Sequence, residues 1–222
     1  MRRIRTRPRV PTTGIRSMNN AAALNTPSLT APYGPLVRRI EAEATVIGDQ
    51  ILKIDHFLNH RIEPAFITEM GRELARRVGR FEPSVILTAE ASGIAPGLVV
   101  AQALGVPLVY AKKYAPQVES PAIARIIPSP TKGGETKLVL SQRYIVPGDR
   151  VVIVDDFLSN GRTAVALIEM AREAGAEVLC ASFIVEKRFK QGHGAIEAEG
   201  VPVSTLAQVE ALENGRAVLS QP

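Results

Sequence analysis

The stretch VVIVDDFLSNGRTA, residues 151–164, constrains the fold more than any other part of the chain. An apolar run is followed at once by Asp155 and Asp156, then by a short polar turn that contains Gly161, and then by a segment of helical composition. Unbroken apolar runs of this length are typical of strands buried on both faces of a sheet. The stretch therefore predicts a buried strand that ends at adjacent carboxylates and leads through a tight turn into a helix.

Apolar runs of strand length alternate with helix-length segments through most of the chain after Pro35. The first helix is expected to start at Pro64 and to carry an apolar stripe as far as Val78. Further strands are expected at 84–89, 108–111, 151–154 and 177–185, and further helices at 95–104 and 162–174. This alternation predicts an α/β fold with a parallel sheet, in which ligands bind just beyond the carboxyl ends of the strands.

Prolines and glycines interrupt the segment between Tyr114 and Tyr144. Two short pieces within it, 122–127 and 137–140, have strand-like composition and are expected to pair as a ribbon. A long non-helical excursion between two strands is often the lid of an active site, and the alternative is a surface loop without function.

The positive net charge belongs to one end of the chain. Residues 1–34 contain six arginines and no acidic residue, and without them 21 basic and 22 acidic residues leave a net charge of −1. This proline-containing tail is expected to be an irregular extension of a folded domain at 35–222. Its role stays open between a transit peptide, a nucleic-acid-binding arm and a non-functional extension, with Met18 as an alternative start. The nearly neutral body argues against a nucleic-acid partner.

The chain lacks the patterns of a membrane protein, a disulfide scaffold or a metal site. The longest apolar stretch, 94–110, is interrupted by Pro96 and Pro107 and is too short to span a bilayer. Cys180 is the only cysteine, which excludes an intrachain disulfide and favours the cytoplasm. His56 and His60 are four residues apart, but no cysteine or carboxylate cluster accompanies them, so no protein metal site is expected.

The turn after Asp155 and Asp156 carries the groups that a ribose phosphate requires. Backbone N–H groups at the start of a helix bind phosphate, and Ser159, Asn160 and Thr163 add side-chain donors. Carboxylates repel phosphate, but they accept hydrogen bonds from vicinal hydroxyls or face a developing cation. The alternative is an aspartate pair that only caps a helix. No Walker loop and no G-x-G-x-x-G follows a strand, which argues against nucleotide triphosphate hydrolysis and dinucleotide binding.

This stretch resembles the phosphoribosyl pyrophosphate signature of type I phosphoribosyltransferases, with Asn160 where members commonly have Thr. The resemblance implies a Rossmann-like core, a small hood subdomain formed mainly by 36–62 and the C-terminal segment, and a flexible lid at about 114–144. It implies that Asp155 and Asp156 are catalytic and contact the ribose hydroxyls. The residues implied to bind the 5′-phosphate are Ser159, Asn160, Gly161, Arg162 and Thr163.

Further blocks are similar to bacterial xanthine phosphoribosyltransferases and extend the resemblance over nearly all of residues 36–222. These blocks are GDQILKID with FLNH at 48–60, ASGIAP at 91–96 and VEKRF at 185–189. They imply that pyrophosphate is bound by Ala91, Ser92, Gly93, Lys112 and Lys113, and the purine by Leu52, Asn59 and Lys187. An ammonium such as that of Lys187 donates to an exocyclic oxygen and repels the amino group of adenine.

The implied reaction transfers the 5-phosphoribosyl group from phosphoribosyl pyrophosphate to N9 of xanthine. Mg²⁺ is implied as an ion held mainly by the pyrophosphate of the substrate, and a homodimer is implied by the family. Ser159 stands where many purine enzymes have a carboxylate, and Ser92 stands where adenine enzymes usually have Arg, and both departures favour an acidic oxopurine. Transfer to guanine or hypoxanthine remains open. A purine-responsive transcriptional regulator of the same fold is the alternative from another class, although the tail is too short for a winged-helix domain.

Overall fold

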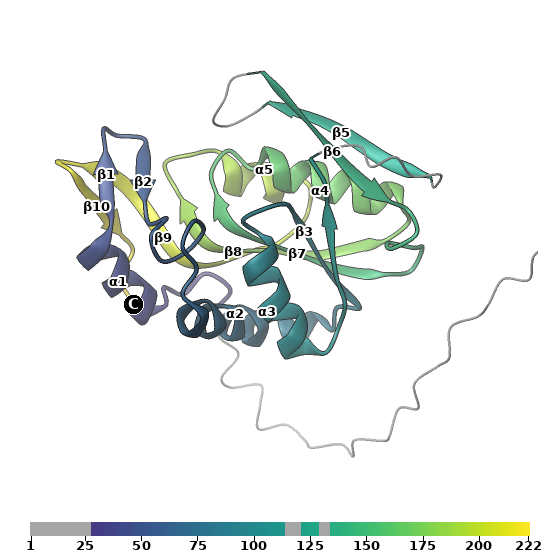
Figure 1. Cartoon of the computed structure of the whole chain (residues 1–222), viewed down its shortest axis with the longest axis horizontal. Coiled ribbons are helices and arrows are strands. Elements are labelled where there is room, and N and C mark those ends of the chain that lie inside the picture. The colour runs from purple at the N-terminus through teal and green to yellow at the C-terminus, as the bar shows by residue number, and fades with distance from the viewer. Residues whose placement is uncertain (1–27, 114–120, 129–133) are drawn as a thin grey trace, which may run out of the picture.

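The computed structural model describes residues 28–113, 121–128 and 134–222 (Figure 1). Its centre is a six-stranded sheet in the order β10-β9-β8-β7-β3-β4. The parallel strands are β3 (Val85–Ala89), β4 (Leu108–Ala111), β7 (Arg150–Leu158), β8 (Glu177–Lys187) and β9 (Val203–Glu213). The edge strand β10 (Arg216–Leu219) pairs antiparallel with β9. The predicted α/β fold with a mostly parallel sheet is confirmed.

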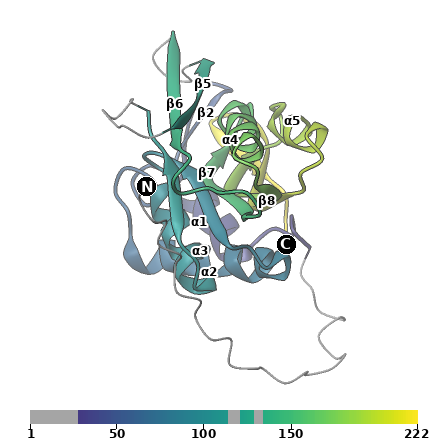
Figure 2. The ribbon, with the colours of Figure 1, turned by 90° about the vertical axis from the view of Figure 1, so that its right-hand side faces the viewer.

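Helices cover both faces of this sheet (Figures 1 and 2). On one face lie α2 (Pro64–Val78), which continues into the 3₁₀ turn η2 (Gly79–Phe81), and α3 (Ile94–Leu104). On the other lie α4 (Arg162–Glu173) and α5 (Gly192–Ala198). Two hydrophobic cores lie on opposite faces of the sheet, and successive residues of one strand point into opposite cores, as Val152 and Ile153 do on β7. Burial on both faces explains why the central strands read as unbroken apolar runs.

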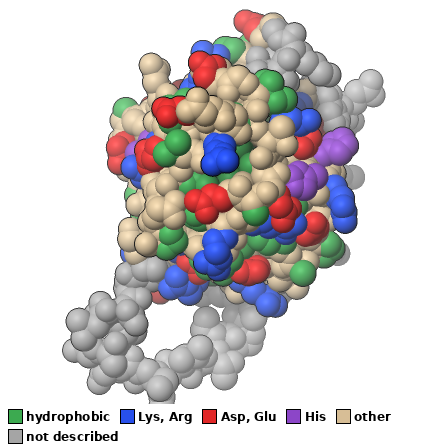
Figure 3. Space-filling model, turned by 90° about the vertical axis from the view of Figure 1, so that its left-hand side faces the viewer, with side chains coloured by type: hydrophobic (Ala, Val, Ile, Leu, Met, Phe, Trp, Pro, Cys, Tyr) green, Lys and Arg blue, Asp and Glu red, His purple; other side chains and the backbone are tan. Residues whose placement is uncertain are grey.

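The hood lies beside the β9–β10 end of the sheet (Figure 1). It consists of α1 (Gly34–Glu43), which the sequence analysis missed, and of an antiparallel hairpin of β1 (Thr45–Ile47) and β2 (Ile51–Lys53). Figure 3 views this end of the molecule and shows acidic and basic side chains interspersed on its surface.

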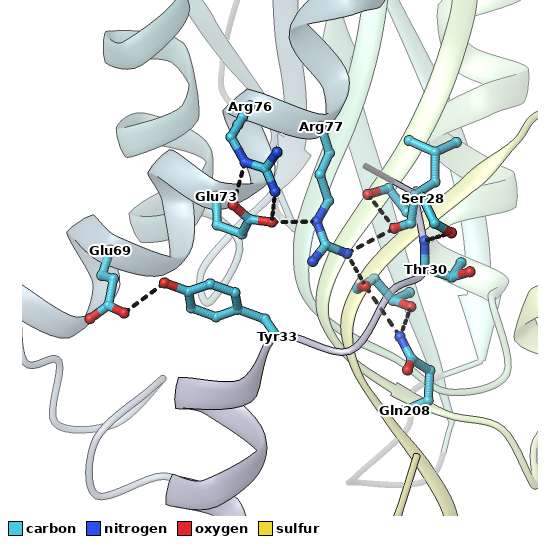
Figure 4. Close-up of polar contacts among 11 residues, drawn as sticks. Ser28, Thr30, Tyr33, Glu69, Glu73, Arg76, Arg77 and Gln208 are labelled. Carbon is cyan, nitrogen blue, oxygen red and sulfur yellow. Dashed lines mark hydrogen bonds and ion pairs between the residues drawn. The ribbon is translucent and has the colours of Figure 1, made fainter. Parts of the chain in front are cut away.

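The expected boundary between tail and domain at residue 34 is too late. The N–H of Thr205 donates to the carbonyl of Leu29 at 3.0 Å, and the N–H of Tyr33 donates to the carbonyl of Leu206 at 2.7 Å. Arg77 of α2 also donates to the Leu29 carbonyl at 3.1 Å, so the segment is held from two sides (Figure 4). Residues 28–33 are therefore docked on the domain, and residues 1–27 lie outside the described residues.

The predicted ribbon between β4 and β7 is present. Its strands β5 (Ala122–Pro128) and β6 (Glu135–Ser141) pair antiparallel and extend away from the sheet beside α4 (Figure 2). Arg125 on the ribbon forms ion pairs with Glu169 at 2.8 Å and Glu173 at 2.7 Å, both on α4. The expected lid also includes residues 114–120 and 129–133, which lie outside the described residues.

Two predicted strands end too early, and one parallel strand was missed. β7 was expected to end at Val154 and instead runs through both aspartates to Leu158, because its backbone stays paired with β8. β8 runs on to Lys187 and is followed by the parallel strand β9, so it is not the last parallel strand. β9 carries Ser204, Thr205 and Gln208, which are buried, and these polar residues concealed it in the sequence.

His56 and His60 do not share a helix face, because residues 55–59 form turns. Within the described ranges, no group of three or more His, Cys, Asp or Glu residues is placed to hold a metal ion. A search of the same ranges finds no helix with the length and apolar character to cross a membrane.

Candidate active site

A cavity of about 270 Å³ opens at the carboxyl ends of β3 and β7. This is the place where ligands bind in parallel sheets, as the sequence predicted. Its walls come from the turn after β3, the end of β7, the turn that leads into α4, and Lys113 just after β4. Of the residues predicted for the site, Ser92, Lys113, Asp155, Asp156, Ser159, Asn160, Gly161, Arg162 and Thr163 line it. One cavity therefore joins the turn predicted for the 5′-phosphate to part of the group predicted for pyrophosphate.

The turn at 159–163 presents backbone donors to this cavity. Gly161 has a φ of +76°, a left-handed conformation that glycine adopts without steric cost, and α4 begins at the next residue. Among the described residues no side chain caps the N-terminus of α4, so its first N–H groups are left for a ligand. Such a helix terminus favours an anion through both its donors and its dipole.

Asp156 is held from three directions. The side-chain amide of Asn59 donates to Oδ2 at 2.7 Å, and the hydroxyl of Ser92 donates to Oδ1 at 3.0 Å. The N–H of Phe157 also donates to Oδ1 at 2.9 Å, and the residue is 6% exposed. A carboxylate with this many donors has a fixed orientation before any substrate arrives.

Asp155 has a different environment. Burial, reinforced by the neighbouring charge of Asp156, raises the pKa of Asp155 well above its usual range, and Lys113 opposes this shift. The N–H of Asp156 donates to Asp155 Oδ1 at 2.9 Å. Burial and the charge of Asp156 therefore favour the protonated form of Asp155.

The turn after β3 approaches Asp155 closely at Gly93. A Cβ atom on Gly93 would lie 2.0 Å from Thr88 Oγ1 and 2.5 Å from Asp155 Oδ1, so no larger residue fits there without movement. The peptide bond between Glu90 and Ala91 is cis, and a side-chain oxygen of Glu90 accepts from the N–H of Lys113 at 2.5 Å. The turn after β3 and the start of the segment after β4 are thus joined at the cavity.

Lys112 and Lys113 occupy different positions. Lys113 lines the cavity, whereas the backbone of Lys112 forms a bridge with Val139 on the ribbon through hydrogen bonds of 2.9 and 2.8 Å. Ala91 and Gly93 flank Ser92 without lining the cavity themselves.

The residues predicted for the purine lie at the hood side. Lys187 Nζ donates to the backbone carbonyl of Gln50, at the tip of the β1–β2 hairpin, at 2.9 Å, and lies 5.9 Å from the ring centroid of Phe157. Lys190 Nζ donates to the side chain of the same Gln50. Burial, reinforced by the charge of Lys190, lowers the pKa of Lys187. Leu52 on β2 packs in the core, and like Lys187 it is not among the residues that line the cavity.

Several lining residues were not predicted. Glu90 follows β3 directly, so its position just beyond the carboxyl end of a parallel strand could have marked it as a ligand-binding residue. Phe183 lies in the middle of β8 and Pro128 at the end of the ribbon, and no local pattern marks either of them. Gln50 belongs to a block that the resemblance included, whereas Lys190 carried no signal.

The cavity offers carboxylate oxygens but no closed ligand set for a metal. Glu90, Asp155 and Asp156 line it, but within the described residues these side chains are not placed to hold a metal ion together. A Mg²⁺ ion at this place would take most of its oxygen ligands from a phosphate-bearing substrate and from water, which is the usual binding mode of Mg²⁺.

Comparisons with known proteins agree with this geometry. The phosphoribosyl transferase domain family matches residues 55–209. A xanthine phosphoribosyltransferase of Chloroflexus aurantiacus is 51% identical over 191 residues, which cover 86% of this chain and 90% of that protein. A xanthine phosphoribosyltransferase of Deinococcus deserti is 42% identical over 181 residues, which cover 81% of this chain and 94% of that protein.

Solved structures of adenine phosphoribosyltransferases share the fold. The enzyme of Rhodothermus marinus superposes with a TM-score of 0.64 at 24% identity, covering 79% of this chain and 99% of that one. The enzyme of Giardia lamblia, complexed with 9-deazaadenine, superposes with a TM-score of 0.65 at 19% identity, covering 78% and 97%. At these identities the likeness concerns the fold and not the choice of base.

Proposed function

Since the chain belongs to the phosphoribosyl transferase family, we propose that it transfers the 5-phosphoribosyl group from phosphoribosyl pyrophosphate to N9 of xanthine. The products are xanthosine 5′-monophosphate and pyrophosphate, and the role is purine salvage. The relatives from Chloroflexus aurantiacus and Deinococcus deserti, at 51% and 42% identity, support the choice of base. The observation that carries the proposal is the cavity in which Asp155 and Asp156 stand between a phosphate-binding turn and Lys113.

We assign each part of phosphoribosyl pyrophosphate to a part of the cavity. The backbone N–H groups and side chains of 159–163 hold its 5′-phosphate, and Asp155 and Asp156 accept hydrogen bonds from its ribose hydroxyls. Lys113, Lys112 and the amides of 91–93 hold its pyrophosphate. Because this substrate is used as its magnesium complex, the metal enters with the pyrophosphate and requires few protein ligands.

Charge separates as pyrophosphate departs from C1′. The sugar becomes cation-like next to the two aspartates, while Lys113 and the turn amides stabilise the leaving anion. A cation-like sugar next to Asp155 favours the ionised form of this carboxyl, because an opposite charge stabilises a carboxylate. The protein contributes position and electrostatics and forms no covalent bond to the substrate.

The purine lies on the hood side, between β7 and the β1–β2 hairpin. Lys187 donates to an exocyclic oxygen of the base, and Phe157, which is half-buried beside it, covers one face of the ring. Asn59 reaches the same place while it holds Asp156, and Leu52 supports the hairpin from below. An ammonium group in this position selects oxopurines over adenine.

We further propose a homodimer in the cytoplasm. The homodimer rests on the family resemblance. The cytoplasmic location rests on cysteine usage, since Cys180 is the only cysteine of the chain and no intrachain disulfide can form. Light scattering of the purified chain during size-exclusion chromatography measures the oligomeric state, and a monomer at working concentration would contradict the dimer.

The test of function is turnover by the purified chain with phosphoribosyl pyrophosphate and Mg²⁺. We expect the highest kcat/KM with xanthine, lower values with guanine and hypoxanthine, and the lowest with adenine. Equal or faster use of adenine contradicts the proposed specificity, and faster use of guanine or hypoxanthine assigns the enzyme to those bases. Absence of turnover together with tight operator binding in a gel shift at physiological salt would favour the regulator instead.

A further inference from the structure

The phosphate-binding turn rests on the start of α5. The N–H of Gly192 donates to the carbonyl of Ser159 at 2.9 Å. A Cβ atom on Gly161 would lie 3.0 Å from Gly192 Cα, and one on Gly192 would lie 2.3 Å from the Ser159 carbonyl oxygen. The two backbones are in direct contact, so the position of Gly192 sets the position of the turn.

A hydrogen bond to a buried carboxylate holds the residue that follows Gly192. His193 Nδ1 lies 2.7 Å from an oxygen of Glu186 on β8, and Glu186 is 1% exposed. The hydroxyl of Thr205 donates to the other oxygen of Glu186 at 3.2 Å, and the side chain of Gln208 donates to that hydroxyl at 2.6 Å. The carboxylate that holds His193 is itself oriented by β9.

The far end of α5 has an anchor of its own. Arg172 on α4 binds the Glu199 carboxylate at 2.7 Å and the Glu199 carbonyl at 2.6 Å. Ile196 in the middle of the helix is fully buried. These contacts keep α5 attached to the domain without the help of Glu186 and His193. The contact between Glu186 and His193 lies at the first turn of the helix, next to Gly192.

We infer that Glu186 and His193 are positioning residues for the transfer reaction, acting through Gly192 on the turn at 159–163. Neither side chain lines the cavity, so neither contacts the donor substrate directly. They hold the backbone of Gly192 in place, and Gly192 in turn holds the amides that receive the 5′-phosphate. The inference rests on the proposed function, because it takes the turn to be the 5′-phosphate site.

The primary variant is His193→Ala. Glu186 keeps the Arg188 guanidinium at 3.6 Å and the Thr205 hydroxyl, so the fold is retained. We expect the KM for phosphoribosyl pyrophosphate to rise about tenfold, because a displacement of 1 Å in a binding group costs up to roughly a hundredfold in rate. The KM for xanthine changes less than about twofold, since the base site lies on the other side of β7.

Binding measurements separate positioning from general loosening. By calorimetry, ribose 5-phosphate should bind His193→Ala more weakly than it binds the wild type, and pyrophosphate should bind both proteins alike. His193→Asn, which keeps an N–H donor facing Glu186, should restore most of the affinity for ribose 5-phosphate. Glu186→Gln provides an independent route to the same loss and serves if His193→Ala does not fold.

Two controls use the same helix. Arg172→Ala removes the anchor at its far end, and Glu197→Ala removes the exposed second partner of His193 at 3.3 Å. Both should keep the wild-type KM for phosphoribosyl pyrophosphate. The inference would be overturned if the KM for phosphoribosyl pyrophosphate rose as much in Arg172→Ala as in His193→Ala, or if it did not change in His193→Ala. It would also be overturned if His193→Ala bound pyrophosphate as much more weakly as it bound ribose 5-phosphate. Turnover by the wild type is measured in the same series, so inactive wild type contradicts the proposed function and an active wild type with unaffected variants contradicts only the inference.

Discussion

The side-chain amide of Asn59 donates a hydrogen bond of 2.7 Å to Asp156, although the two residues are 97 positions apart in the sequence. Asn59 belongs to the hood, and Asp156 lies near the carboxyl end of β7. Ser92, in the turn after β3, donates to the other carboxylate oxygen at 3.0 Å. One carboxylate thus connects the hood, the pyrophosphate turn and the central strand, and the arrangement of the site depends on it.

Replacement of Asn59 by Ala should lower kcat/KM by about 10- to 100-fold, since a hydrogen bond to a charged group contributes about 1.5–3 kcal/mol. Asn59→Asp should cost more, because it places another carboxylate beside Asp156. Steady-state kinetics with both substrates measures the effect, and the melting temperature checks that the fold is kept. Wild-type kinetics in Asn59→Ala would remove Asn59 from the site.

The raised pKa of Asp155 makes the stability of the ligand-free protein depend on pH. In the unfolded chain this carboxyl ionises near 3.8, whereas burial and Asp156 raise its pKa in the folded protein. Between these two values the folded state binds more protons, so the free energy of unfolding falls as the pH rises. Asp155→Asn removes this dependence and should gain stability relative to the wild type between pH 4 and neutrality, although its kcat/KM falls by orders of magnitude. Urea unfolding of both proteins over this range is the measurement, and parallel curves would argue against the assignment.

Lys187 should determine the preference for oxopurines. Lys187→Met removes a charged donor and should raise the KM for xanthine about 10- to 100-fold. The KM for adenine should fall, because the variant no longer repels the amino group of that base. Lys190→Met is the matched control, because Lys190 contacts the side-chain oxygen of Gln50 and not its backbone carbonyl. It should affect the KM less, but loss of its charge should raise the pKa of Lys187 and move the alkaline limb of the pH profile for kcat/KM to higher pH. The same KM change in both variants would contradict a specific role for Lys187.

Gly93 should tolerate no side chain. The Cβ of Gly93→Ala would lie 2.5 Å from Asp155 Oδ1 and force that carboxylate to move. We expect a loss of about 1–3 kcal/mol in stability from overpacking and a drop of roughly a hundredfold in kcat/KM from displacement of Asp155. Gly194→Ala in α5 meets nothing within 4 Å and should stabilise the protein slightly. Chemical denaturation should show that Gly93→Ala is less stable than the wild type and that Gly194→Ala is more stable. Kinetics should show the drop in kcat/KM in Gly93→Ala.

The buried pair of Arg77 and Glu73 should support folding and not catalysis (Figure 4). Arg77 is 2% exposed, lies 2.8 Å from Glu73 and also donates to the carbonyls of Leu29 and Thr205. Arg77→Ala leaves buried acceptors without their partner and should cost about 3 kcal/mol. Arg76→Ala removes the exposed partner of the same carboxylate and should cost about 1 kcal/mol or less. Both variants should keep the wild-type kcat/KM below their melting temperatures, and a specific loss of activity would contradict this separation.

Local patterns predicted the core well where both faces of a strand are buried. The strand expected at 84–89 is β3, whose five residues are all buried, and the helices that begin at Pro64 and end before Gly105 lie where the sequence placed them. The same patterns failed where polar side chains lie inside strands. Asp156 stays within β7 because Asn59 and Ser92, which are distant in the sequence, donate to its carboxylate. The buried Thr205 lies within β9, where it donates to Glu186 of β8 and accepts from Gln208 of its own strand.

The candidate site was foreseen in its parts. The turns after β3 and β7 were predicted as phosphate-binding segments, and both reach one cavity. Leu52, which was expected beside the purine, packs in the core, and its contact with the base stays a prediction. The sequence did not predict the contact between Gln50 and Lys187 or that between Glu186 and His193. In each pair the two residues belong to different segments, and no sequence motif relates one to the other.

By itself the sequence determined the α/β core and the chemistry of the turn at 159–163, because strand burial, helix starts and turn conformation depend on residues that are neighbours in the chain. Only the tertiary structure decided that Asn59 orients Asp156, that Lys187 meets the hood hairpin, and that the start of α5 contacts the turn at 159–163. These contacts join segments far apart in the chain, and their geometry follows from how the two hydrophobic cores place the sheet, the hood and α5 relative to one another.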